Sequence, residues 1–180
     1  AETAALTTTQ VQALTTSGVS SMTTAQAAAL TTTQVQALTT TQVTNLTTSQ
    51  TVALTPTQIG NLTTDQVVAL SADQVSKLTT SQVQALTTSQ VVALETSDLA
   101  QMSTTQIAAL TTTQATNLTT DQVVALTTAQ VSNLTVNQTV VLTTSQVAAL
   151  QTDDFAALKT TQFSALTTQQ VQSGLTTDQV

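Results

Sequence analysis

The chain has 180 residues, of which 40% are apolar and 6% are charged, and nine acidic residues against two basic ones give a net charge of −7. It contains no Cys, His, Trp, Tyr or Arg, which excludes disulfides, thiolate or imidazole metal sites and nucleophiles that need Cys or His. Two lysines and two phenylalanines cannot form a basic patch or a base-stacking platform, so we expect no nucleic-acid partner. No stretch reaches the ~18 apolar residues of a spanning helix, so we also expect no membrane insertion.

An eight-residue repeat begins near the start of the chain. From Leu6 to Leu166 every eighth residue is Leu, or Met at Met22 and Met102, which makes 21 positions in one register. The consensus octad is Leu-Thr-Thr-x-Gln-Val-x-Ala, and we name its positions a to h, with Leu at a. A fixed period indicates a stacked array. We therefore expect one octapeptide-repeat domain over residues 1–180, in register over 6–173 and part of a longer array.

Positions b and e of the octad form the capping-box pattern Ser/Thr-x-x-Gln. In this motif the hydroxyl of b accepts from the backbone N–H of e, and the Gln side chain returns to the N–H of b. Both halves are present in 17 of the 21 octads. Leu at a and the apolar residue at f then occupy the two positions of a hydrophobic staple. Each octad therefore predicts one helix start.

Other residues along the chain agree with this frame. Pro56 falls at position c, the first helical residue, where a fixed φ and a missing N–H are tolerated. Lys77 falls at h, where the helix ends and a positive charge is favoured. Aspartates at d or e lie in the first turn, where the helix dipole favours negative charge. These are Asp65, Asp73, Asp98, Asp121, Asp153, Asp154 and Asp178.

Each helix must stop within its own octad. Eight residues at ~100° each would rotate the Leu stripe by about 80° per repeat, so a continuous helix would have no lasting apolar face. A helix of about six residues is unstable alone, so neighbouring repeats must bury Leu at a, Val at f and Ala at h together. The predicted fold class is all-α, a solenoid of very short capped helices.

The variable positions indicate how many octads complete one coil. Asn at h and Val at g alternate from octad to octad, which favours two octads per coil, although three remain possible. Residues from Thr44 match those from Thr116, an offset of 72 residues, which indicates duplication of a block. The positions concerned are Asn45, Asn61, Asn117 and Asn133 at h, and Val52, Val68, Val124 and Val140 at g.

The alternative fold is a β-solenoid, because Thr and Val favour strands. In a strand, however, positions a and e would share one face while f pointed to the other. The core would then mix Leu with Gln, so the helical solenoid is preferred.

Three of the octads that depart from the consensus contain Gly18, Glu95 and Gln151, and the end of the register also departs from it. Gly18 replaces Gln in one of them, and in two others Glu95 and Gln151 replace the capping hydroxyl while Asp98 and Asp154 replace Gln. A carboxylate at e is expected to serve the box in the latter two. A one-residue slip occurs at Gly174, which we expect to be a left-handed residue just after a helix.

Four groups of residues are candidate sites, although none completes a known catalytic motif. Asp153 and Asp154 could ligate a metal, but no further carboxylate or Gly-rich loop completes a calcium site, which favours a role at the helix dipole. A row of Thr at c could bind a regular lattice such as ice, or simply face water. Phe155 and Phe163 at f are expected in the core. Asn-x-Thr glycosylation patterns begin at Asn45, Asn61, Asn117, Asn133 and Asn137.

Segments such as Ala-Leu-Thr-Thr-Ser-Gln-Val at 85–91 and Ala-Leu-Thr-Thr-Ala-Gln-Val at 125–131 carry a family resemblance. They resemble the Thr/Gln/Ala octapeptide tracts of very large bacterial surface and adhesin-like proteins, and the match covers nearly the whole chain. The resemblance implies an extracellular or cell-surface structural stretch. The chain has few Asp and Gly residues, so the resemblance does not extend to the calcium-dependent rigidity common in such adhesins.

The expected function is that of a non-enzymatic structural repeat, either the spacer or stalk of a surface protein or a self-associating filament subunit. Its expected partners are flanking repeats or further copies of itself. The alternative is a solenoid that binds ice, glycan or peptide through its Thr or Gln rows. We expect no catalytic, cofactor-binding or metal-binding residues, and no cofactor.

Overall fold

Short helices follow one another along the whole of residues 3–179, which the computed structural model of the chain describes. These residues contain 21 α-helices of four to seven residues, two 3-10 helices and no strand. The fold is therefore all-α, and the β-solenoid is excluded. The elements are η1 (Thr3–Ala5), α1 (Thr8–Gln12), α2 (Thr16–Ser20), α3 (Thr24–Ala28), α4 (Thr32–Ala37), α5 (Thr40–Thr44), α6 (Thr48–Ala53), α7 (Pro56–Gly60), α8 (Thr64–Val68), α9 (Ala72–Lys77), α10 (Thr80–Ala85), α11 (Thr88–Ala93), α12 (Thr96–Gln101), α13 (Thr104–Ala109), α14 (Thr112–Thr116), α15 (Thr120–Ala125), α16 (Thr128–Val131), α17 (Val136–Val141), α18 (Thr144–Ala149), α19 (Thr152–Ala156), α20 (Thr160–Phe163), α21 (Thr168–Gly174) and η2 (Thr177–Gln179).

Every α-helix starts at position c, as the capping box predicts. Within residues 3–179, 17 of the 21 α-helices have the complete box, and the exceptions are α2, α12, α19 and α20. In α2 the hydroxyl of Thr15 still accepts from the N–H of Gly18. Pro56 is the first residue of α7, and Lys77 is the last residue of α9. The local sequence thus sets where each helix begins.

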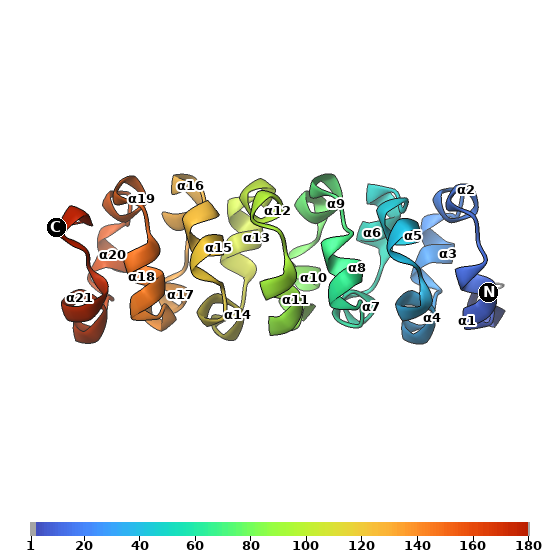
Figure 1. Cartoon of the computed structure of the whole chain (residues 1–180), viewed down its shortest axis with the longest axis horizontal. Helices are drawn as coiled ribbons and strands as arrows, with labels where there is room; N and C mark the ends of the chain where they lie inside the picture. Colours follow the sequence, from blue (N-terminus) through green and yellow to red (C-terminus); the bar gives the residue numbers. More distant parts are fainter. Residues whose placement is uncertain (1–2, 180) are drawn as a thin grey trace. The chain divides into compact units, whose positions relative to one another are not determined.

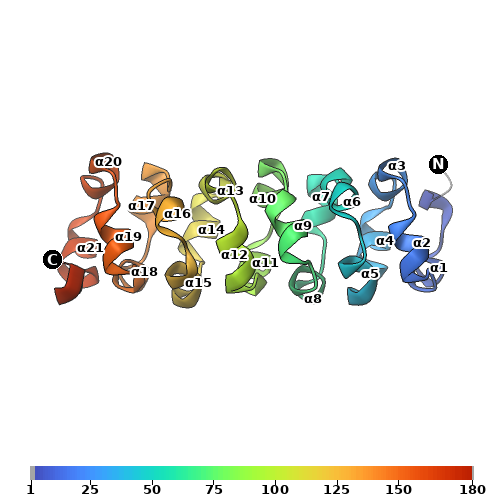
Figure 2. The same cartoon turned by 90° about the horizontal axis from the view of Figure 1, so that it is seen from above.

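The chain divides into two compact units, Ala1–Leu94 with α1 to α11 and Glu95–Val180 with α12 to α21. Within each unit, every helix packs against the helix three further along the chain, and α19 packs against η2. Figures 1 and 2 show this winding in the first unit, where the chain passes through α2 and α3 before α4 lies beside α1. One coil of the solenoid therefore takes just over three helices.

This packing corrects the expectation of two octads per coil. The alternation of Asn and Val does not mark two sides of a coil, because these residues have other roles. Asn45, Asn61 and Asn117 are C-cap residues, and Asn133 follows the C-cap residue Ser132. Each of the four Asn side chains donates from Nδ2 to the backbone carbonyl four residues earlier in its own helix, at 2.8 Å. The Val residues at g are partly exposed rather than facing one side of the core. The alternation therefore reports how single helices end, and the number of helices per coil is set by packing between helices.

The core runs through the middle of each unit and is built from positions a and f. From Leu30 to Leu150 every Leu or Met at a is buried, and the apolar side chains at f are buried from Val11 to Phe155. Burying one such side chain contributes roughly 1.5–3 kcal/mol, which no helix of this length could obtain alone. Ala at h is mostly half-buried rather than fully buried, so the predicted core is confirmed for a and f but only partly for h.

Two glycines are explained by close packing between coils. A Cβ on Gly60 of α7 would lie 2.6 Å from the backbone oxygen of Ala85 in α10. A Cβ on Gly174 would lie 3.2 Å from the backbone oxygen of Thr144. No glycine in residues 3–179 has a positive φ, and Gly174 is the last residue of α21. The expectation of a left-handed Gly174 outside the helix is therefore wrong, because α21 absorbs the extra residue by running to seven residues.

Candidate functional site: glutamine bridges between coils

The most regular polar feature of the structure is the Gln side chain at e, which is buried from Gln34 to Gln170 wherever Gln occupies that position. Its amide oxygen closes the capping box by accepting from the N-cap backbone N–H, at 2.6–3.0 Å. Its amide nitrogen points the other way, into the preceding coil. In Gln42, for example, Nε2 donates to the backbone oxygens of Val11 (2.9 Å) and Leu14 (2.7 Å). One side chain therefore joins two coils.

The same bridge recurs along both units. The carbonyls that receive the amide nitrogen lie 28 and 31 residues earlier, at positions a and f, where an earlier helix ends. A helix leaves its last carbonyls without intrahelical partners, and a buried unpaired carbonyl costs about 1–3 kcal/mol. Each Gln thus satisfies the start of its own helix and the end of a helix one coil earlier. Sequence reasoning found the first role from the local spacing but missed the second.

Three glutamines show that the bridge depends on a neighbouring coil. Gln10 and Gln26, in α1 and α3, make only the box, and their Nε2 atoms have no partner among residues 3–179. Gln179, which lies beyond the slip at Gly174, still donates to the backbone oxygens of Val147 (3.0 Å) and Leu150 (2.7 Å). The distances along the chain become 32 and 29 residues. The slip therefore shifts the register by one residue but keeps the bridge.

Two buried carboxylates interrupt the Gln series. Asp98 and Asp154 lie at e, and neither α12 nor α19 has a side-chain cap hydrogen bond. The expectation that these carboxylates serve the capping box is wrong, because α12 and α19 have no box and the Asp side chain is one methylene shorter than Gln. Burial raises the pKa of Asp98 above its usual 3.8, and the negative charge of the nearby Glu95 raises it further. A hydrogen bond from Ser97 lowers this pKa by a smaller amount.

The structure separates Asp153 from Asp154. Asp153 is exposed in the first turn of α19, which fits a role at the helix dipole, whereas Asp154 is 3% exposed. Within residues 3–179 no three His, Cys, Asp or Glu side chains are grouped as metal ligands. In the same part of the chain, no helix is long and apolar enough to cross a bilayer.

The remaining candidate residues are spread over the surface. Consecutive Thr residues at c fall on different sides of a coil, because the helix packed beside each one is three octads away. They therefore do not form one continuous row. The Asn residues of the glycosylation patterns have outward-facing helix-end positions, except Asn137, which is exposed in the first turn of α17.

Phe155 and Phe163 meet edge to face, with ring centroids 5.9 Å apart. Phe155 is buried, as expected at f, but Phe163 is 52% exposed. The prediction that both belong to the core is therefore wrong for Phe163. Within residues 3–179, the close packing of α20 is against α17, three helices earlier, whereas most helices also pack against the helix three further along.

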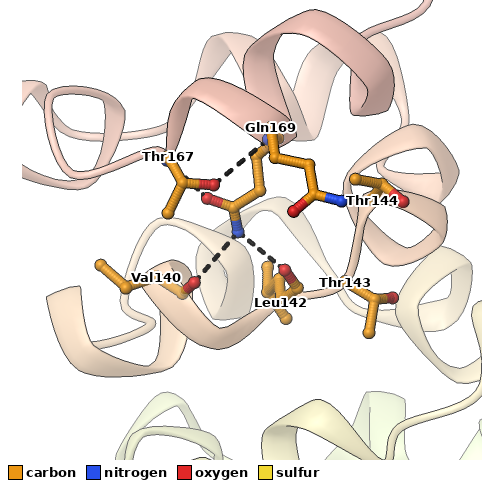
Figure 3. A pocket seen from close by; sticks show the side chains of 7 residues that line it. Val140, Leu142, Thr143, Thr144, Thr167 and Gln169 are labelled. Carbon is orange, nitrogen blue, oxygen red and sulfur yellow. Dashed lines mark hydrogen bonds between the residues drawn. The ribbon is translucent and has the colours of Figure 1, made fainter.

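A cavity of about 380 Å³ in the second unit lies beside one Gln bridge. Gln170 is one of its lining residues: its backbone N–H donates to Thr167 Oγ1, and its Nε2 donates to the backbone oxygens of Val140 and Leu142. Figure 3 shows Val140, Leu142 and Thr167 around the cavity. Its other lining side chains include Thr144 and Gln169, so only hydroxyl, amide and apolar groups surround it. The cavity offers hydrogen bonds but no general acid, base or nucleophile pair.

Comparison with known proteins agrees with the repeat. The chain matches the ALTTAQ repeat family over residues 3–40, 32–64, 50–80, 64–94, 91–128 and 147–180. The six letters correspond to positions h and a to e of the octad, and they occur unchanged as Ala125 to Gln130. No curated protein matches the chain. Since the matched segments cover most of its length, the chain belongs to the ALTTAQ repeat family.

Proposed function

We propose that the chain is a non-enzymatic structural repeat that acts as an extracellular spacer or stalk of a large bacterial surface protein. The observation that carries this proposal is the Gln bridge. The Gln side chains that recur at e are buried from Gln34 to Gln170 and are bonded to the backbone of the preceding coil, which supports a role in holding coils together. The resemblance of the octads to surface and adhesin-like tracts supports the extracellular setting.

A second version of the same function is a filament subunit. Phe163 and Val171 lie at f, where other coils bury the side chain, yet they are 52% and 43% exposed. Among the residues that the structure describes, the amide nitrogens of Gln10 and Gln26 have no partner, whereas the same atoms bridge coils elsewhere. A further coil would cover the exposed side chains of Phe163 and Val171, or would meet the amide nitrogens of Gln10 and Gln26. Such a coil could come from the same chain or from another copy. Contacts of this head-to-tail kind need not close.

Two experiments test these proposals. Protease treatment of intact cells, followed by immunodetection, is expected to remove the repeat before any cytoplasmic marker. A signal that persists until lysis would contradict an extracellular spacer. Sedimentation velocity over a wide concentration range then separates the two versions, because growing oligomers support the filament and monomers throughout leave only the spacer.

A further inference from the structure

The carboxylate of Asp154 lies inside the second unit at a position where the consensus has a Gln amide. The residue is 3% exposed, and its Oδ1 accepts a hydrogen bond of 2.7 Å from Thr128 Oγ1. Its Oδ2 is buried and has no hydrogen-bond partner among residues 3–179. A buried charged oxygen without a partner is strongly unfavourable. An ionised Asp154 therefore needs another positive or hydrogen-donating group at this atom.

The backbone oxygens beside Asp154 also lack their usual donor. In the preceding octad, Gln146 Nε2 donates to Ala115 O (3.0 Å) and Leu118 O (2.7 Å). The corresponding oxygens for position 154 belong to Val123 and Leu126, and an ionised carboxylate has no proton to give them. Within residues 3–179, Val123 O accepts only from the Leu126 N–H.

These oxygens lie where α15 ends, and a helix C-terminus attracts positive charge. The hydroxyl of Thr128 already donates its proton to Asp154, so its lone pairs remain available. Gln151 does not replace the missing amide, because its Nε2 donates to the neighbouring Val124 O, at 2.9 Å. The Asp side chain is one methylene shorter than Gln, so its carboxylate does not reach as far toward these carbonyls as the Gln amide does.

We propose that this junction binds one hard metal cation, with calcium as the first candidate. The ligands are the carboxylate of Asp154, the hydroxyl of Thr128 and the backbone oxygens of Val123 and Leu126. Carboxylate and carbonyl oxygens are the ligands that calcium, sodium and potassium prefer, and the set contains no nitrogen or sulfur for a softer metal. The cation replaces the Gln amide by joining α19 to the end of α15 through charge.

Thermal unfolding of the whole chain, followed by circular dichroism, tests this site. After treatment with EDTA, the midpoint is measured in choline chloride alone, in sodium chloride, in potassium chloride, and in choline chloride with added calcium, all at equal ionic strength. The midpoint is expected to rise with the bound cation, and the folding equilibrium to shift about ten-fold when that cation is present at ten times its Kd. Isothermal titration calorimetry is expected to give one site per chain.

Two variants make the test specific. Asp154→Gln restores the consensus amide, so it is expected to unfold at a higher temperature in choline chloride and to lose the response to the cation. Asp153→Asn changes the exposed neighbour and is expected to keep the full response. If Asp154→Gln does not fold, Asp154→Asn is expected to lose the response in the same way. Equal midpoints in all four salts, or the same response in Asp154→Gln as in the natural chain, would overturn the proposal.

Discussion

The Gln at position e uses its two amide atoms for different tasks. The oxygen accepts from the start of its own helix, and the nitrogen donates to carbonyls at the end of an earlier one. A Glu side chain has nearly the same shape and can still accept, but it cannot donate when ionised. A Gln→Glu change therefore removes the bridge to the earlier helix but keeps the capping box.

We expect Gln146→Glu to lower the free energy of unfolding by about 2–4 kcal/mol, because it leaves the oxygens of Ala115 and Leu118 unpaired and places a charge beside them. Gln10→Glu is the matched control, since Gln10 makes the box without a bridge. It is expected to change stability by less than ~0.5 kcal/mol. Urea denaturation followed by circular dichroism measures both, and equal losses in the two variants would show that the bridge contributes nothing.

Asp98 makes stability depend on pH. Its raised pKa means that the folded chain holds this proton more tightly than the unfolded chain, so stability falls as pH rises from 3.8 through the folded pKa and stays low above it. We expect Asp98→Asn to be more stable than the natural chain at neutral pH. The difference should disappear as the pH falls below 3.8. Urea midpoints across this range measure it, and a difference independent of pH would contradict the assignment.

Glu95→Gln is the control for the second cause of this shift. It removes the neighbouring negative charge but leaves Asp98 buried. Its increase in the free energy of unfolding at neutral pH is therefore expected to be smaller than that of Asp98→Asn. A larger gain would mean that repulsion, and not burial, dominates.

The residue-scale roles that could be predicted from the sequence are those that act over three or four positions. The box joins b to e within one octad, so Thr39 and Gln42 identify it by spacing alone. The bridge from Gln42 reaches Leu14, 28 residues away, and nothing in the octad specifies that distance. The same spacing predicts Asp98 and Asp154 at helix starts, as observed, but it does not show that a side chain one methylene shorter than Gln fails to close the box.

At the scale of helices, stability comes from contact between elements. A helix of four to seven residues is far below the ~12 residues needed for marginal stability in water. The close approach of α7 and α10 is possible because Gly60 has no side chain to meet the backbone of Ala85. Such contacts depend on the size of one residue and are invisible to the periodic pattern.

We expect Gly60→Ala to destabilise the chain by ~1–3 kcal/mol, because its Cβ would lie 2.6 Å from Ala85 O and backbone atoms cannot move aside cheaply. In Gly18→Ala the new Cβ meets only the Thr15 hydroxyl, at 3.3 Å. That control is expected to be neutral or to gain up to about 1 kcal/mol from helix propensity. Thermal unfolding compares the two, and a neutral Gly60→Ala would contradict the close packing.

At the scale of the whole molecule, the number of helices per coil is the feature that the sequence predicted least well. The duplication at 72 residues reflects this number only indirectly. Nine octads equal three intervals of three helices, so both copies can keep the same packing between helices. Thr44 Oγ1 donates to Ala69 O, and Thr116 Oγ1 donates to Val141 O, each 25 residues further on. The two copies therefore repeat the same contact between coils. Recognising this from the sequence would have required knowing which helices touch.

The coil itself can be measured with pairs of spin labels, because the chain has no natural Cys. Ser49, Asp65 and Asp73 are exposed residues at position d of α6, α8 and α9. Since α6 packs on α9, and packed helix axes lie about 8–10 Å apart, labels at Ser49→Cys and Asp73→Cys are expected to show strong dipolar broadening in electron paramagnetic resonance spectra. Labels at Ser49→Cys and Asp65→Cys are expected to show much weaker broadening. The reverse order would contradict a coil of just over three helices and support one of two.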